Sequence, residues 1–226
     1  GSWKTVSPSA IKRDKKWPTP REMSQLEILK VINNFKNTAI FAKKIGFDCL
    51  EIHMAHGYLL HQFFSPISNK RSDDYGGNLK NRSRLLIEVF KIVRKVWPKN
   101  RLLGARITGS DNLKNGLNIN DAVFLSKELK KLKADYVAVT SGGIKPKTNI
   151  KFFPGYNVKF AKRIKEKVRI NVIALGMLNS INLINKILKK KNADIVAVSR
   201  RFINEPNWLQ KKQNTYRNVN QGKKIP

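Results

Sequence analysis

Two histidines and a tyrosine, His53, His56 and Tyr58, lie within six consecutive residues. They follow the apolar run of residues 47–52, which predicts a β-strand. Side chains at the carboxyl end of a parallel strand face the ligand crevice of an α/β protein. The two imidazoles could therefore donate hydrogen bonds to one substrate oxygen, with the Tyr58 phenol as a proton source. We predict no metal site, because no third ligand follows at a suitable spacing.

The rest of the chain alternates short apolar runs with amphipathic stretches, which predicts repeated βα units around a parallel sheet. Residues 1–24 contain three prolines and predict a loop. Ser24 and Glu27 then form a capping box, and the helix that they begin should end near Gly46. Further strands are expected at residues 102–107, 136–140, 171–175 and 195–198, and helices near residues 81–97, 120–132, 156–168 and 180–191.

The later predicted strands end at residues suited to binding an anion. Glycine lets backbone N–H groups approach a phosphate, and arginine adds a bidentate positive partner. These strand ends are Arg106, residues 140–143, Gly176 and residues 199–200. The last two together predict a phosphate site of the kind that (β/α)8 barrels build after their final two strands.

The composition predicts a single domain over residues 1–226, because 41% of the residues are hydrophobic and suffice for one core. No apolar run approaches the roughly 18 residues needed to cross a bilayer, and no secretory leader is evident. We therefore expect a cytoplasmic protein without membrane contact. Cys49, the one cysteine, lies in the apolar run before His53 and is predicted to be buried.

The formal charge of +31, from 46 basic and 15 acidic side chains, would attract polyanions non-specifically. The basic residues are spread over the whole length and form no dedicated arm or aromatic platform. Compositional drift in a low-G+C genome explains the same excess. Polyanion binding is therefore an alternative hypothesis, and we do not favour a nucleic-acid partner.

The segment from Gly46 to Arg84 resembles the old yellow enzyme family of FMN-dependent ene reductases. The shared positions are Gly46–Asp48, Glu51–His53, His56–Leu60, Gln62–Phe63, Ser65–Pro66, Ser68–Asn69, Arg71, Asp73, Tyr75–Gly77 and Asn81–Arg82. The His-x-x-His form is similar to the bacterial branch of NADPH dehydrogenases and xenobiotic reductases. Weaker matches continue to about residue 209.

This resemblance implies FMN as cofactor, NAD(P)H as reductant and an electron-poor alkene as substrate. It assigns His53 and His56 to the substrate carbonyl and Tyr58 to protonation of the α-carbon. It places Arg106 beside the flavin pyrimidine edge. The FMN phosphate would be held by Gly176, Met177, Ser199 and Arg200.

A (β/α)8 barrel has eight strands, whereas this sequence predicts five, which resemble the last five βα units of the family. The chain thus resembles the final two thirds of such an enzyme. A partial parallel barrel has open edges and an uncovered apolar face. We therefore expect either a fragment or a chain that depends on a partner, which includes a homo-oligomer. A truncated, inactive remnant is the other alternative.

Overall fold

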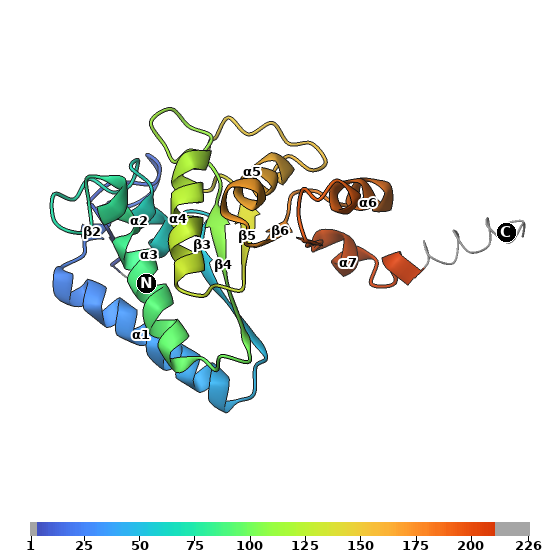
Figure 1. Cartoon of the computed structure of the whole chain (residues 1–226). Coiled ribbons are helices and arrows are strands. Elements are labelled where there is room, and N and C mark those ends of the chain that lie inside the picture. Colours follow the sequence, from blue (N-terminus) through green and yellow to red (C-terminus); the bar gives the residue numbers. More distant parts are fainter. Residues whose placement is uncertain (1–3, 211–226) are drawn as a thin grey trace, which may run out of the picture.

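The computed structural model describes residues 4–210, which are built around one five-stranded parallel sheet (Figure 1). The strands of this sheet are β3 (Cys49–Met54), β4 (Leu102–Thr108), β5 (Tyr136–Thr140), β6 (Asn171–Ala174) and β7 (Ile195–Val196). The helices are α1 (Gln25–Lys44), α2 (Leu59–Phe64), α3 (Leu79–Val96), α4 (Ile119–Lys131), α5 (Val158–Val168), α6 (Ile181–Lys189) and α7 (Arg200–Asn204). The predicted alternation of strands and helices is confirmed.

The strand order β3-β4-β5-β6-β7 follows the chain, and at least one helix lies between each strand and the next. An open doubly wound sheet instead reverses its strand order at a switch point and carries helices on both faces. A sheet that advances in one direction is wound as in a (β/α)8 barrel. The described residues therefore form five consecutive units of the barrel fold.

Two strand boundaries differ from the sequence prediction. β3 lies two residues later than the predicted strand of residues 47–52, so it includes His53. β7 has two residues rather than the expected four, and among the described residues it pairs only with β6. An edge strand is stabilised from one side only, which explains its early end.

Helix α1 begins at the predicted capping box. The Glu27 N–H donates to Ser24 Oγ at 3.3 Å, and the Glu27 carboxylate accepts the Ser24 N–H at 2.8 Å. The Arg21 side chain, followed by the Ser24 N–H, lowers the pKa of Glu27 to about 2. Each of these contacts satisfies a group that the helix itself leaves unpaired.

The first prediction concerns this cap. Ser24→Ala should lower the free energy of unfolding by about 1 kcal/mol, because the first turn loses a side-chain acceptor. Urea denaturation measures the change. Thr38→Ala, in the interior of the same helix, is the control and should be neutral or stabilising, because alanine has the higher helix propensity. Equal losses in both variants would contradict a capping role for Ser24.

Basic residues gather at the carboxyl ends of the helices. Helices α1, α3 and α4 each end in a pair of them: Lys43 and Lys44, Arg94 and Lys95, and Lys130 and Lys131. Cations at this end interact favourably with the helix dipole. Part of the large positive charge therefore has a structural role.

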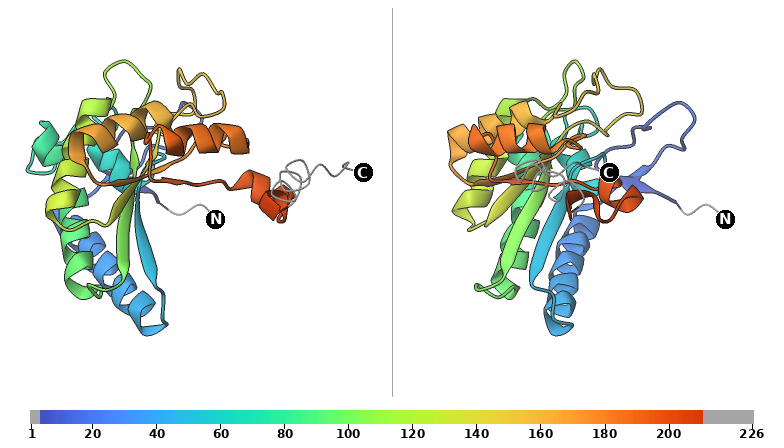
Figure 2. Two further views of the ribbon diagram at one scale, coloured as in Figure 1. Left: turned by 45° about the vertical axis from the view of Figure 1, so that its right-hand side comes forward. Right: turned by 90° about the vertical axis from the view of Figure 1, so that its right-hand side faces the viewer.

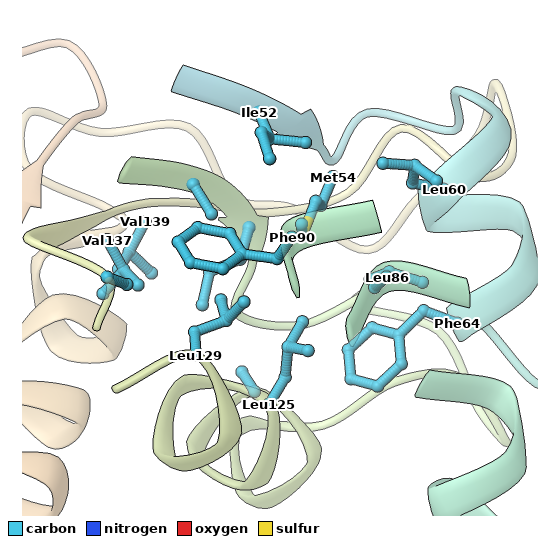
Figure 3. Close-up of a cluster of buried hydrophobic side chains, with 14 of the residues drawn as sticks. Ile52, Met54, Leu60, Phe64, Leu86, Phe90, Leu125, Leu129, Val137 and Val139 are labelled. Carbon is cyan, nitrogen blue, oxygen red and sulfur yellow. The ribbon is translucent and has the colours of Figure 1, made fainter. Parts of the chain in front are cut away.

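The hydrophobic core lies between the sheet and helices α2, α3 and α4 (Figure 3). Alternate residues of β3 and β5 point toward these helices, because successive side chains of a strand face opposite sides of the sheet. The side chains that meet there are Ile52, Met54, Val137 and Val139 from the strands and Leu60, Phe64, Leu86, Phe90, Leu125 and Leu129 from the helices. This packing fixes which residues of β3 face away from the core.

The opposite face of the sheet is open. In β3 it carries Cys49, Glu51 and His53, and its apolar residues include Leu102 and Ile195, which are 54% and 52% exposed. The prediction that Cys49 is buried is wrong: its side chain is exposed and its sulfur lies 3.5 Å from the Tyr136 hydroxyl. The reason is alternation, since Leu50 and Ile52 occupy the helix-covered side of the same strand.

The segment before α1 is more ordered than a plain loop. Its short strands β1 (Val6–Ser7) and β2 (Arg21–Glu22) pair in parallel. The buried Arg71 side chain donates to the carbonyls of Pro8 and Met23 at 3.0 and 2.6 Å. The predicted loop is thus corrected to a small two-stranded element that Arg71 attaches to the rest of the structure.

Candidate active site

His53, His56 and Tyr58 form one cluster at the carboxyl end of β3. The ring of His53 lies 5.1 Å from that of His56 and 5.3 Å from that of Tyr58, measured between centroids. In the parallel register His53 is opposite Arg106 of β4, so both side chains share the open face. The structure therefore brings together the three predicted catalytic residues and one of the predicted cofactor ligands.

The position of His56 depends on a close crossing of two loops. His56 and Gly57 both have positive φ, at 59° and 76°. A Cβ on Gly57 would lie 2.2 Å from the carbonyl oxygen of Gly143, in the loop after β5. The His56 Nε2 is 2.9 Å from the hydroxyl of Thr140 at the end of β5. The loops after β3 and β5 thus orient the imidazole together.

The second prediction tests this crossing. Gly57→Ala should destabilise the fold by roughly 2 kcal/mol or more, because alanine disfavours positive φ and its methyl group would overlap the Gly143 carbonyl. Thermal or urea denaturation measures the loss. Gly77→Ala is the control: its φ is also 76°, but a Cβ there meets no atom within 4 Å. The same loss in both variants would assign the effect to backbone strain alone.

Both histidines of the cluster favour the neutral form. Burial, followed by the charge of Arg106, lowers the pKa of His53 and lowers that of His56 to about 4. Burial also raises the pKa of Glu51, while the Arg106 charge opposes that shift. A neutral imidazole carries one N–H donor, which suits a substrate oxygen that gains negative charge.

The third prediction follows from the pKa of His56. Between about pH 6.5 and pH 4 the unfolded chain binds a proton at this residue that the folded chain does not, so acid in this range lowers stability. Below both pKa values the contribution of His56 no longer changes. His56→Asn should therefore lose less stability than the unaltered chain between pH 7.5 and pH 5, as measured by urea denaturation. An identical loss would mean that His56 titrates normally in the fold.

The buried pair of His61 and Asp111 supports the cluster from below and was not predicted as functional from the sequence. His61 Nδ1 accepts the Gly57 N–H at 2.8 Å, so its Nε2 donates to Asp111 at 2.9 Å. Asp111 also accepts from the Ser65 hydroxyl and the Leu117 N–H. His61 thereby fixes the backbone between His56 and Tyr58, a role that only its neighbours in space reveal.

The predicted phosphate ligands lie after β6 and β7, which are parallel neighbours. Gly176 and Met177 both have positive φ, at 117° and 53°. Ser199 and Arg200 are exposed at the start of the short helix α7, which Figure 2 shows at the end of the sheet away from α1. The loop after β6 therefore has the predicted backbone form, and the Ser199–Arg200 assignment stays a prediction.

Two buried polar groups fit FMN at this face. The Arg106 Nε is buried and has no hydrogen-bond partner among the described residues, as does the amide nitrogen of Asn157. That amide nitrogen lies 3.2 Å from the position of a Cβ on Gly176, and the Asn157 oxygen accepts from Ser141. An unpaired cation by the histidines and an unpaired donor by the glycine loop match a flavin ring and its phosphate chain. The sequence gave no separate signal for Asn157.

Within residues 4–210, no group of three or more metal-ligating side chains is present. None of the helices in the same range is long and apolar enough to span a membrane.

Comparison with known proteins adds the ancestry. Residues 4–218 match the sequence pattern of the NADH:flavin oxidoreductase / NADH oxidase family. The chain belongs to this family. An NADPH dehydrogenase of Clostridium acetobutylicum is 41% identical over 209 residues, and one of Bacillus subtilis is 38% identical over 200 residues. These matches cover 92% and 88% of this chain, and they confirm the resemblance to the old yellow enzymes.

Solved structures related to the flavin oxidoreductase family have the same fold. A 2-naphthoyl-CoA reductase in complex with 2-naphthoyl-CoA aligns over 96% of this chain with a TM-score of 0.84 and 27% identity, covering 33% of that protein. Morphinone reductase in complex with tetrahydroNAD aligns over 93% with a TM-score of 0.76 and 25% identity, covering 59% of that protein. The barrel winding of the sheet is thus shared.

The chain spans about 60% of the length of the relatives that it matches, namely 61% of the Clostridium protein and 58% of the Bacillus protein. Five of the eight units of a barrel are a similar share. The number of strands and the matched length therefore agree.

Proposed function

We propose that this chain is the part of an FMN-dependent oxidoreductase that carries the substrate site, and that the enzyme transfers hydride from NAD(P)H through the flavin to an electron-poor alkene. The observation that carries the proposal is the cluster of His53, His56 and Tyr58 beside Arg106 on the open face of the sheet. The family membership supports the flavin, and the names of the NADPH dehydrogenase relatives support the reductant.

The two histidines would bind the carbonyl oxygen of the substrate. Each neutral imidazole donates one hydrogen bond, and together they stabilise the negative charge that develops on this oxygen during reduction of the conjugated C=C bond. Their low pKa keeps them neutral at physiological pH. Bound FMN supplies the hydride.

Tyr58 would supply the proton. Its phenol is 63% exposed and lies beside His53, so a substrate held by the histidines can be reached by the hydroxyl. A positioned acid of this kind completes the reduction by protonating the α-carbon. The assignment of the proton to Tyr58 separates it from the binding role of the histidines.

The remaining predicted residues would hold the cofactor. Arg106 presents its cation to the flavin pyrimidine edge, where it stabilises negative charge. Backbone N–H groups of Gly176 and Met177, with the side chains of Ser199 and Arg200, would bind the phosphate. Asn157 would add its amide donor beside Gly176.

The test is reconstitution of the purified chain with FMN. Saturable uptake that turns the protein yellow, reduction of the flavin by NADPH without oxygen, and reoxidation by cyclohexenone are the expected results. Arg106→Leu should weaken FMN uptake. A chain that takes up no FMN would support the inactive remnant instead, and flavin that is reduced but not reoxidised by the alkene would contradict the substrate assignment.

A further inference from the structure

A second cavity adjoins the histidine cluster. Its volume is about 190 Å³, and it borders Gly57, the residue between His56 and Tyr58. One wall comes from the segment between β1 and β2, another from the start of α2, and a third from the loop after β5. Figure 2 shows the segment before α1 as a projecting loop, in blue. The cavity thus lies where three loops meet, one of which carries the catalytic cluster.

The lining of this cavity is basic. Lys12, Arg13 and Lys145 line it, and none of its lining residues is acidic. The Lys145 ammonium donates to the Lys12 carbonyl at 2.7 Å, which holds this charge at the junction of two loops. Three cations without a lining carboxylate favour an anionic ligand.

Two polar atoms in the lining lack partners. The Arg13 Nε and the Gln62 Oε1 are both buried without a hydrogen bond among the described residues. Other atoms of the same side chains are held: Arg13 donates to the Gly143 carbonyl at 3.2 Å, and Gln62 donates to the Gly57 carbonyl at 2.7 Å. The two side chains are therefore oriented, with one donor and one acceptor left for a ligand.

An aromatic surface completes the cavity. Trp17 is 49% exposed and lines the same space, and the Arg13 guanidinium lies 5.3 Å from the centre of its ring. An indole of this exposure offers a flat face on which a nucleobase can stack. The cations, the acceptor and the indole correspond to the phosphate, the ribose hydroxyl and the base of a nucleotide.

We propose that this cavity binds the phosphate-bearing adenosine end of the nicotinamide dinucleotide reductant, an inference that rests on the proposed function. Lys12, Arg13 and Lys145 bind the phosphates, Gln62 Oε1 accepts a ribose hydroxyl, and adenine stacks on Trp17. The contacts of Gln62 and Arg13 to Gly57 and Gly143 join this subsite to the loop crossing that holds His56. The dinucleotide then extends from this cavity toward the catalytic cluster.

The experiment titrates the flavin-free chain with 2′-phosphoadenosine 5′-diphosphoribose, which carries the adenosine end without nicotinamide, and follows binding by calorimetry at fixed salt. Arg13→Gln and Lys145→Gln should each weaken binding about tenfold, because each removes a charge-assisted contact. Lys30→Gln, which removes an exposed charge of α1 outside the cavity, is the matched control and should leave binding unchanged. Thermal melts of the variants check that each is folded, and Arg13→Lys, which keeps the charge, should bind more tightly than Arg13→Gln.

A second arm separates a nucleotide subsite from a general anion site. Trp17→Ala should weaken binding of the probe but not of inorganic phosphate, because only the probe carries a base. Unchanged probe binding in the Arg13 and Lys145 variants, equal weakening in Lys30→Gln, or phosphate binding as tight as that of the probe would each overturn the proposal. Since no flavin is present, these outcomes are independent of FMN uptake, so failure of the subsite is distinguishable from failure of the proposed function.

Discussion

Tyr58→Phe should lower the rate of alkene reduction by about 10²–10⁴-fold while flavin reduction by NADPH continues at its normal rate. The phenol is the proton source of the cluster, and phenylalanine preserves the ring that lies 5.3 Å from His53. Hydride transfer to the flavin needs no proton from this residue, so the two half-reactions should separate. Stopped-flow absorbance of the flavin, with NADPH and then with cyclohexenone, measures each half-reaction.

Tyr75→Phe is the matched control for this experiment. It removes a phenol whose hydroxyl donates to Glu88 at 3.0 Å, away from the histidine cluster. Its rates should equal those of the unaltered chain in both half-reactions. If Tyr58→Phe slowed both half-reactions equally, the phenol would act in binding or folding and not as the acid.

His56→Leu should lower alkene reduction by about 10²–10³-fold, because a donor to the developing oxyanion is lost. His56→Asn should retain much of the activity, since an amide also donates a hydrogen bond from a side chain of moderate size. The comparison distinguishes hydrogen bonding from the filling of space. Steady-state rates with cyclohexenone, measured for both variants under the same conditions, give the ratio.

The pH profile adds a second criterion for His56. Its pKa of about 4 means that the imidazole is already neutral at pH 6, so the rate should not show a protonation step near 6.5 from this residue. A step near pH 6.5 that disappears in His56→Asn would contradict the buried, neutral histidine. Equal activity of the Leu and Asn variants would remove the hydrogen bond from the mechanism.

Much of the fold could be predicted because its signals are local. The capping box of Ser24 and Glu27, the helical period of α3 and the apolar run of β5 depend on neighbours in the chain, and the structure confirms each of them. The errors occurred where tertiary contacts decide. Cys49 reads as buried from its apolar neighbours, but alternation along β3 places it on the open face.

The candidate site was only partly predictable for the same reason. The spacing of His53, His56 and Tyr58 indicates a strand end with polar side chains, and the family resemblance adds their expected roles. Neither His61 nor Asn157 stands out, because the partners that give them meaning, Asp111 and the Gly176 loop, are distant in sequence. Hydrogen bonds between distant residues leave no local pattern.

By itself, the sequence determined the order of strands and helices, the family and the place of the histidine cluster at the end of β3. Only the tertiary structure decided that Arg106 stands opposite His53, that Gly57 crosses Gly143, and that burial lowers the pKa of His56. Periodicity and caps act between residues a few positions apart, so they can be read along the chain. Register, loop crossing and desolvation arise from which distant segments pack together, and they exist only in the folded chain.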